Sequence, residues 1–519
     1  MGLVENKIGD VERFDEIISI MAEQGLGVLL DELDLFHRVS VTQKFSREKV
    51  PPPERLRETF EQLGPTFIKF GQIMAERPDV VPERYVEELE KLQDDVPGFE
   101  SEKAKQIVDE EIGLDKFENF EEEHLAAASI AQVHRATLNS GEEVVVKIRR
   151  PGIKDQIERD LEIIEFLAKR GIKRSDYLSD VQLLNAVKEF ARWTRQELNL
   201  KREARNGELL AENLSDEENI KIPEIYAEMT TQKVMVMEYV DGIKSSKTEK
   251  LREMDIDNKK LAETAIRSSL KQILRDGFFH ADPHPSNFLV REDGTLIMID
   301  FGMMGNLTKD TRENMALMIL HSLREDVDKA FDDLKRMGHV QSDADEQALK
   351  AELEEKILLI QNANLEEVSF TGQFLDMTIQ ASRHGVIMPQ SLVLMGKSMV
   401  TMEGIGMAVY PEYEINDQFK KTIKEILRDD FKPEKLMKEL SLDLVENKDL
   451  ITELPSKLNE LTEKEDTEVK VVNEGGDNRT LEAGLIISSA FLVTQGQKEL
   501  IALGALEMAF AAYLFNKNN

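Results

Sequence analysis

The sequence predicts an α+β fold in which helices flank two small β-rich regions, and three observations lead to this prediction. Apolar residues recur at helical spacing through most of residues 1–120, 154–213 and 256–277. A β-rich stretch within 124–148 contains the turn Asn139-Ser140-Gly141, which is typical of a hairpin. A second hairpin is predicted at 288–300 around Glu292-Asp293-Gly294, and short β runs are predicted at 220–225 and 233–239.

The order of these elements divides the chain into five parts. Residues 1–120 are predicted to form a helical extension that Pro51-Pro52-Pro53 interrupts. Residues 121–242 form a smaller lobe with the first hairpin, and 243–462 form a mostly helical lobe with the second. The polar stretch 463–479, with Gly475-Gly476, is predicted to be a linker to an apolar helical hairpin at 480–519.

Composition narrows the classes of function. Of 519 residues, 41% are hydrophobic, which is enough for a sizeable core. With 67 basic and 101 acidic residues the net charge is −34, which argues against a nucleic-acid partner because that needs a basic face. A nucleotide is still compatible, since local amides, lysines and a metal decide that contact. The absence of cysteine excludes disulfides and thiolate chemistry, and the first residues lack the pattern of a signal peptide.

The loop that precedes the second hairpin carries polar residues at an informative spacing. Two prolines between His280 and Asn287 predict an irregular loop, in which Asp282 and Asn287 stand five residues apart. Asp300-Phe301-Gly302 follows thirteen residues after Asn287, and the hairpin should bring Asn287 and Asp300 together. Mg²⁺ prefers oxygen ligands, which these two residues can supply, while Asp282 could orient or deprotonate an acceptor hydroxyl. The alternative is a polar loop with a coincidental Asp-Phe-Gly.

Upstream residues complete this phosphate and metal constellation. Lys147 ends the run Val144-Val145-Val146 and matches the strand lysine that contacts phosphates in kinases, although a lysine at a strand end is usually solvated. Its acidic partner should lie on a helix, and Glu203 is the candidate. The alternative for Glu203 is an ordinary surface glutamate.

In this order the motifs resemble those of the UbiB (AarF) family of atypical protein-kinase-like proteins, over residues from about 60 to 305. The resemblance implies a bilobal protein-kinase-like fold with an N-terminal helical extension and a C-terminal helical hairpin. It implies ATP and Mg²⁺ as cofactors, with a base-like role for Asp282 and metal-binding roles for Asn287 and Asp300.

One family signature lies in the helical extension, at Lys69-Phe70-Gly71-Gln72. Phe67, Phe70 and Met74 form an apolar stripe, whereas Lys69 and Gln72 belong to a polar stripe that could be merely solvated. The resemblance implies that this helix folds over the active site with Lys69 and Gln72 pointing inward.

Two further signatures surround the first hairpin. Ala126-Ala127-Ala128-Ser129 stands where kinases have a glycine-rich loop, and it should be stiffer than glycine or, alternatively, begin a helix. The family's Glu-x-Asp element reads Glu197-Leu198-Asn199, which places Asn199 four residues before Glu203 on one helical face. Glu238, near the end of the run 233–239, is a further nucleotide-binding candidate.

The segment after Asp-Phe-Gly indicates the kind of chemistry. No Ala-Pro-Glu follows, so a platform for peptide substrates is not expected. An ATPase or a small-molecule or lipid kinase fits better, and the resemblance implies support of quinone or isoprenoid-lipid biosynthesis. A non-catalytic nucleotide-binding scaffold is the alternative. A metal hydrolase built on His280, Asp282 and His284 is disfavoured because the prolines exclude the helix that would align the two histidines.

The apolar segments 481–494 and 500–515 are the candidates for a membrane contact. With 14 and 16 residues they reach about 21–24 Å, less than the ~30 Å hydrocarbon core, and Glu482 and Glu507 interrupt them. Either a packing or dimer-forming hairpin or a membrane anchor would fit. The lipid-linked role favours the anchor, with the protein at the cytoplasmic face of the membrane.

Overall fold

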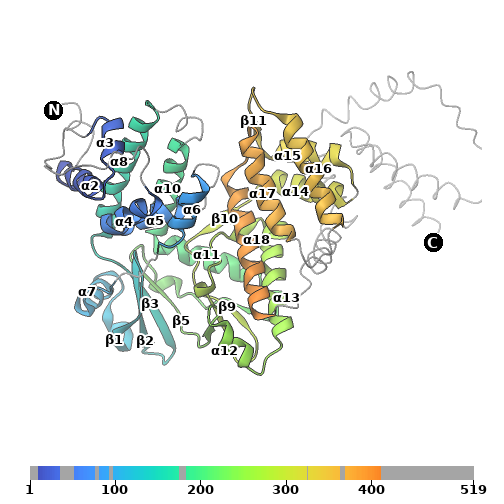
Figure 1. Ribbon diagram of the computed structural model, residues 1–519. Coiled ribbons are helices and arrows are strands. Elements are labelled where there is room, and N and C mark those ends of the chain that lie inside the picture. The colour runs from blue at the N-terminus through green and yellow to red at the C-terminus, as the bar shows by residue number, and fades with distance from the viewer. Residues whose placement is uncertain are drawn as a thin grey trace, which may run out of the picture. The chain divides into compact units, whose positions relative to one another are not determined.

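The computed structural model describes residues 10–35, 52–75, 81–92, 97–174, 183–323, 325–362 and 369–410. The chain divides into two units, Met1–Ile423 and Lys424–Asn519, and every described residue belongs to the first (Figure 1). The predicted linker 463–479 and the predicted apolar hairpin 480–519 therefore lie outside the described residues.

The N-terminal extension is helical, as the periodicity predicts. Asp10 caps the first described helix by accepting a hydrogen bond from the Arg13 amide, and Gly64, with φ 95°, separates two consecutive helices because it adopts a conformation that L side chains rarely take. The helices are α2 (Val11–Glu23), α3 (Gly27–Glu32), α4 (Pro53–Leu63), α5 (Pro65–Ala75), α6 (Glu83–Leu89) and α7 (Ser101–Glu111).

Two later helices complete the hydrophobic core of this extension. These are α8 (Ile153–Gly171) and α10 (Leu183–Glu197), whose buried residues share one core with those of α2 to α5. A buried ion pair joins α2 to α8, since the Arg13 guanidinium donates to the Asp160 carboxylate at 2.8 Å and Asp160 is fully buried. Residues 153–197 thus pack with the extension, although they follow the first hairpin in sequence.

The smaller lobe is a four-stranded antiparallel sheet. Its order is β1 (Phe117–Ala127), β2 (Ala131–Leu138), β3 (Glu143–Arg149), β5 (Val234–Glu238). Alternate residues of β3 face opposite sides, so Val144, Val146 and Ile148 join a core with α7, whereas Val145 joins a core with helix α11 (Leu200–Asn213). Lys147 shares the α11 side with Val145, and this alternation places it in the candidate site.

Strand β1 begins inside the region that the sequence predicts as helix. Residues 117–127 are rich in glutamate and lack β-branched side chains, so only the two phenylalanines favour a strand locally. Pairing with β2, from Phe117 opposite Leu138 to Ala127 opposite Gln132, holds the segment extended despite several register shifts. Tertiary pairing therefore overrides the local preference here.

The second lobe combines a small sheet with a set of helices. Its sheet has the order β4 (Ile220–Lys221), β9 (Leu296–Met298), β8 (Phe288–Val290), β6 (Ile243–Lys244), and β7 (Phe278–His280) pairs separately with β10 (Met304–Asn306). The helices are α12 (Thr248–Glu253), α13 (Asn258–Leu270), which continues into a π-helix (Lys271–Asp276), α14 (Lys309–Leu323), α15 (Val327–Met337), α16 (Glu346–Asn362), α17 (Phe370–Arg383) and α18 (Gln390–Val409). The two-residue strands β11 (His339–Val340) and β12 (Val386–Ile387) pair with each other.

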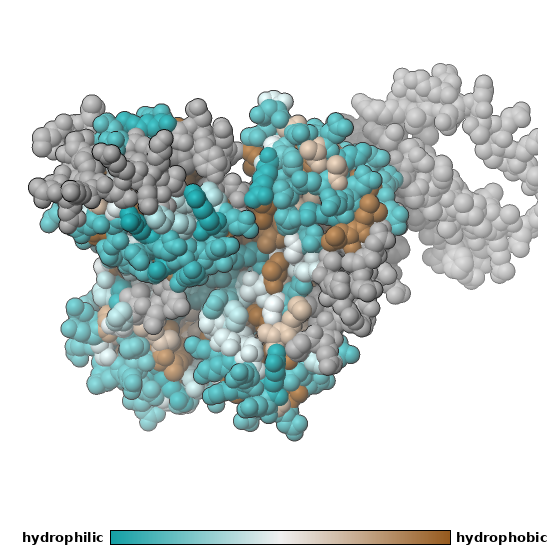
Figure 2. Space-filling view, viewed as in Figure 1, coloured by the Kyte–Doolittle hydropathy of each residue, from teal (hydrophilic) through white to brown (hydrophobic). Residues whose placement is uncertain are grey.

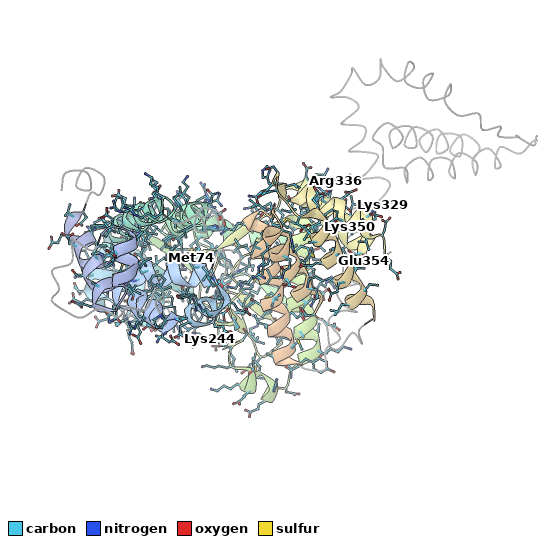
Figure 3. All side chains as sticks on the ribbon, turned by 45° about the horizontal axis from the view of Figure 1, so that its top comes forward. Met74, Lys244, Lys329, Arg336, Lys350 and Glu354 are labelled. Carbon is cyan, nitrogen blue, oxygen red and sulfur yellow. The ribbon has the colours of Figure 1, made fainter. Side chains whose placement is uncertain are left out.

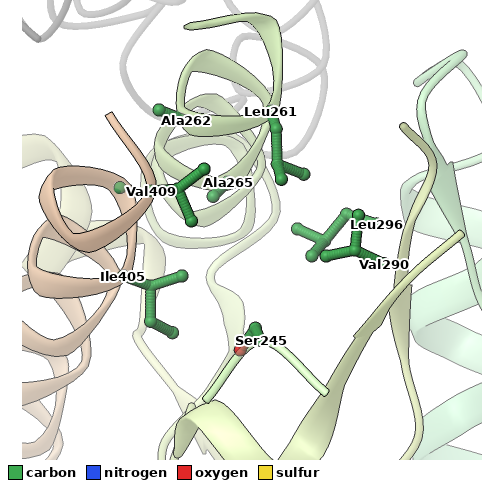
Figure 4. A pocket seen from close by; sticks show the side chains of 9 residues that line it. Ser245, Leu261, Ala262, Ala265, Val290, Leu296, Ile405 and Val409 are labelled. Carbon is green, nitrogen blue, oxygen red and sulfur yellow. The ribbon is translucent and has the colours of Figure 1, made fainter. Parts of the chain in front are cut away.

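Helix α18 is the central helix of this lobe. It is long and apolar enough to cross a membrane by length and composition, but 67% of its most apolar stretch is buried, as in the core helix of a soluble protein. It packs between α13 and α17, and an apolar cavity beside it, lined partly by Leu261, Leu296 and Ile405, has room for little more than one water molecule (Figure 4). In the view of Figure 2 most of the described surface is hydrophilic, in keeping with the net charge.

Candidate nucleotide-phosphate site

Lys147, Glu203 and Asp300 form the centre of the candidate site. The Lys147 Nζ lies 2.6 Å from Glu203 Oε1 and 3.1 Å from Asp300 Oδ2. Strand β3, helix α11 and the segment just after β9 contribute one residue each, so the triangle joins both lobes. The pairing of Lys147 with Glu203 that the sequence predicts is present, and Glu203, at 2% exposure, is not a surface glutamate.

Burial and charge together set the ionisation of this triangle. Burial alone would lower the pKa of Lys147, but the facing carboxylates of Asp300 and Glu203 outweigh it and raise the pKa. Burial raises the pKa of Glu203 to about 7, because its effect is larger than the opposing effect of the Lys147 charge. Burial also opposes ionisation of Asp300, yet Lys147 and the Gly302 N–H lower its pKa to about 2. A charged lysine beside an ionised aspartate is what phosphate and metal binding require.

The Asp-Phe-Gly segment is fixed on both sides of Asp300. Asp300 Oδ1 accepts a hydrogen bond from the Gly302 N–H at 2.9 Å, which turns the chain sharply. The Phe301 ring is fully buried, and its carbonyl accepts from the Asn206 side chain of α11 at 2.9 Å. Gly207 lies beside the same ring, where an added Cβ would come within 2.8 Å of it. The contact explains a glycine in the middle of α11.

His280 connects the loop of Asp282 to Asp300. Its Nε2 lies 2.9 Å from the Asp300 carbonyl, and its Nδ1 accepts from the Asp282 N–H at 3.2 Å, which together assign the tautomer with the proton on Nε2. Burial lowers the pKa of His280, which favours the neutral ring, and Nδ1 can accept the hydrogen bond from Asp282 only when it carries no proton. The sequence suggested His280 only as a ligand in a metal hydrolase, whereas the structure shows that it positions the Asp282 loop. The only sign of this role in the sequence was that His280 stands two residues before Asp282.

Asn287 lies where the hairpin register predicts. Its backbone carbonyl accepts from the Ile299 N–H at 3.0 Å, next to Asp300, and its side-chain nitrogen donates to the Asp282 carbonyl at 3.3 Å. The amide oxygen of Asn287 has no hydrogen-bond partner among the described residues, so it could act as a metal ligand. Among the described residues no group of three or more histidine, cysteine, aspartate or glutamate side chains could hold a metal. Two oxygen donors from protein, with phosphate and water supplying the rest, fit Mg²⁺.

Helix α5 covers the Asp-Phe-Gly segment through an ion pair. Lys69 Nζ lies 2.5 Å from Glu197 Oε1, and the Glu197 Cγ is 3.7 Å from the position of a Cβ built on Gly302. Lys69 therefore pairs with a residue that lies near Gly302, and the inward orientation of Lys69 that the resemblance implies stays a prediction. Gln72 instead donates to the Leu92 carbonyl at 3.2 Å, which ties α5 to the end of α6 and leaves Gln72 without a described contact to the triangle.

The alanine segment is a tight β-hairpin turn, so the alternative of a helix start is wrong. Ala126 and Ala127 end strand β1, and the Ala128 N–H donates to the Ala131 carbonyl at 2.8 Å. The Ala128 carbonyl accepts from the Arg150 guanidinium at 3.1 Å, and Ser129 is buried. These bonds stiffen the loop beyond what alanine alone would do.

Two of the remaining candidates lie apart from the triangle. The Glu238 carboxylate pairs with Lys221 and accepts from the Glu224 N–H at 3.1 Å, so the structure does not bring it to Lys147. Asn199 is the N-cap residue of α11 and its carbonyl accepts a hydrogen bond from the Glu203 N–H at 3.2 Å, so the predicted i, i+4 spacing is present, although α10 ends at Glu197 and α11 begins only at Leu200. Asn199 precedes α11 with φ −109° and ψ 89°, outside the helical region, and its Oδ1 has no partner among the described residues.

The site combines a strand lysine paired with a helix glutamate, the aspartate of an Asp-Phe-Gly segment and a loop that carries an asparagine. This combination defines a protein-kinase-like site. Comparison with known proteins agrees. Residues 91–334 match the ABC1 atypical kinase-like domain, and residues 355–414 match the UbiB helical domain.

Two named relatives narrow the family to which the chain belongs. A protein named probable protein kinase UbiB from Azotobacter vinelandii is 33% identical over 76% of this chain and 75% of its own length. The Arabidopsis thaliana protein ACTIVITY OF BC1 COMPLEX KINASE 8, chloroplastic, is 36% identical over 72% of this chain but only 54% of its own length. The chain thus spans about half the length of some curated relatives. It belongs to the UbiB (ABC1) family of atypical kinase-like proteins, with the α+β kinase-like fold.

Proposed function

We propose that the chain binds ATP with Mg²⁺ and acts as an ATPase or as a small-molecule or lipid kinase, rather than as a peptide kinase. The observation that carries this proposal is the triangle of Lys147, Glu203 and Asp300, because it holds a lysine that is only 16% exposed within hydrogen-bond distance of two carboxyl groups, as phosphate and metal binding in a kinase-like site require. Family membership supports the class of protein but not the reaction.

Each residue of the site would have a defined task. Glu203 orients the Lys147 ammonium toward the oxygens of the bound phosphates. Mg²⁺, held by Asn287 and Asp300, would supply charge neutralisation at those oxygens. Asp282, on the loop that His280 fixes, would orient the attacking hydroxyl or water. The stiff turn at Ala128 would close over the phosphates from the other side.

The surroundings of the site support a small acceptor. After Gly302 the chain enters strand β10, which pairs with β7, and helix α14 begins at Lys309, so the described chain has no extended platform for a peptide there. The ion pair between Lys69 and Glu197 joins α5 to the end of α10, and Glu197 lies near Gly302. Both features favour water, a small molecule or a lipid headgroup as the acceptor.

The biological role is proposed from the names of relatives. The name UbiB of several relatives and the resemblance to that family support a part in quinone or isoprenoid-lipid biosynthesis. Partner proteins of lipid biosynthesis and association with the cytoplasmic face of a membrane through 481–515 belong to the same proposal. A homodimer formed through 481–515 also belongs to this proposal, since a membrane or a second copy of the chain would cover the apolar residues of this segment.

A turnover assay on the full chain tests the reaction. We expect Mg²⁺-dependent ATP hydrolysis that rises when phospholipid vesicles or a phenol-like quinone precursor is added, and that is lost in Asp282→Asn, which keeps the shape of the loop. MgATP binding without turnover under every addition would favour the non-catalytic scaffold. Transfer of phosphate to casein at a rate above that of hydrolysis would contradict the exclusion of peptide substrates.

A further inference from the structure

The outward face of helix α11 carries a concave basic surface that the proposed reaction does not use. Lys201, Arg202 and Arg205 are exposed and, together with the amides of Asn199 and Gln232, line a hollow of about 490 Å³. No carboxylate lines it. In a chain with a net charge of −34, three cations around one hollow are a marked local departure from the average.

These cations are not part of an ion-pair network within the described chain. No described residue makes a salt bridge or side-chain hydrogen bond with Lys201, Arg202 or Arg205, whereas nearby Lys233 pairs with Glu111 at 2.7 Å. Arg202 and Arg205 are three residues apart, and Lys201 and Arg205 four, which are the spacings at which like charges on a helix repel each other. An anionic ligand would offset this repulsion.

The shape and chemistry of the hollow indicate the class of ligand. Two guanidinium groups and an ammonium suit phosphate oxygens, which the arginine fork binds bidentately, and neutral amides can bond to hydroxyls or further oxygens. Only five residues line the hollow, so the ligand that they can contact is compact. The net charge of −34 works against a membrane surface or a nucleic acid, since both need an extended basic face. We propose that this hollow binds a small soluble molecule that carries two or more phosphate groups.

The hollow is separate from the candidate nucleotide site, although both use α11. Glu203, at 2% exposure, points from the helix toward Lys147, whereas Lys201, Arg202 and Arg205 point to solvent. A ligand in the hollow would therefore hold the first turn of the helix that positions Glu203 without entering the site. The binding itself does not depend on the proposed function.

Calorimetry on the full chain with inorganic tripolyphosphate as the probe tests the proposal. We expect the combined change Lys201→Gln, Arg202→Gln and Arg205→Gln to weaken binding at the hollow by about tenfold or more, because three charge-assisted contacts are lost. The matched control changes Lys244, Lys247 and Lys250 to glutamine, which removes the same three charges from another exposed segment (Lys244 is labelled in Figure 3). The control should bind as the unchanged protein does, and added salt should weaken binding in both.

Hydrogen exchange locates the bound probe, since tripolyphosphate could also enter the nucleotide site. Protection of amides in residues 200–206 that disappears in the triple variant supports the proposal. Protection confined to 126–150 and 282–302 overturns it while leaving the proposed function intact. Equal binding by the triple variant overturns it as well. The proposal is also overturned if the triple variant loses only its binding to phosphatidylglycerol vesicles, because the surface would then be a membrane contact.

Discussion

Replacing Asp300 by asparagine should weaken Mg²⁺-dependent ATP binding, and the structure indicates by how much. Asp300 accepts from Lys147 at 3.1 Å and from the Gly302 N–H at 2.9 Å, and it offers its charge to the metal. Asparagine keeps the size and one acceptor oxygen but not the charge. The Lys147–Glu203 pair remains, and because the charge of Asp300 contributes to the raised pKa of Glu203, its removal favours ionised Glu203. We therefore expect the variant to fold.

The size of the effect follows from the difference between charged and neutral contacts. A hydrogen bond to a charged group contributes about 1.5–3 kcal/mol, against about 0.5–1.5 kcal/mol for a neutral one. Losing the charge at the metal alone should therefore cost about 1–2 kcal/mol, which corresponds to a roughly five- to thirtyfold weaker Kd. Binding of ATP in the presence of a chelator should change much less, since Asn287 and Asp300 then have no metal to hold.

Titration calorimetry with MgATP, and with ATP plus chelator, measures both quantities. Asp293→Asn is the matched control, because it makes the same substitution at the exposed turn of the same hairpin, where Asp293 pairs with Arg291. The control should leave the Kd for MgATP unchanged. An unchanged Kd in Asp300→Asn would refute the metal assignment, and equal weakening with and without Mg²⁺ would show that Asp300 acts only through Lys147.

Three further predictions concern stability and the cover of the site. Arg13→Ala leaves the fully buried Asp160 unpaired and should lower the free energy of unfolding by about 3–5 kcal/mol in denaturant titrations; a loss below about 1 kcal/mol would contradict this. Because the pKa of Glu203 is raised to about 7, Glu203 stays protonated to a higher pH in the folded state than in the unfolded chain. Protonation of Glu203 therefore contributes to the free energy of unfolding at low pH, and this contribution should be lost as pH rises from about 5 to 8. Denaturation across this pH range should show a flatter dependence in Glu203→Gln than in the wild type. Lys69→Met removes the partner of Glu197 and should speed amide exchange in α5 by about fivefold, the equivalent of about 1 kcal/mol; unchanged exchange would mean that the pair does not hold the helix.

Local patterns predicted the parts of the site that stand close in sequence. The turn at 292–294 and its flanking apolar residues set the hairpin register, and this register places Asn287 beside Asp300. Lys147 could be assigned from its strand and from its order before Asp300. The pairing of Lys147 with Glu203, across 56 residues, rested on resemblance, because no local rule links a strand to a later helix.

Other features escaped the sequence because their cause is not local. Strand β1 is extended through pairing with β2 and not through its own glutamate-rich residues. Residues 197–203 look like one helix, yet the chain breaks at Asn199 so that Leu200 can bond to Gln232 and Glu203 can face Lys147. The Glu238 carboxylate is taken by Lys221, a contact between strands of different sheets.

The sequence by itself determined the class of site and the residues of its two loops, because hairpin registers and proline breaks act over a few residues. Only the tertiary structure decided how those loops are held. The neutral ring of His280 joins the Asp282 and Asp300 backbones, and α5 reaches Gly302 through Lys69 and Glu197. These contacts depend on burial and on charges brought together from distant segments, and neither can be read from spacing along the chain.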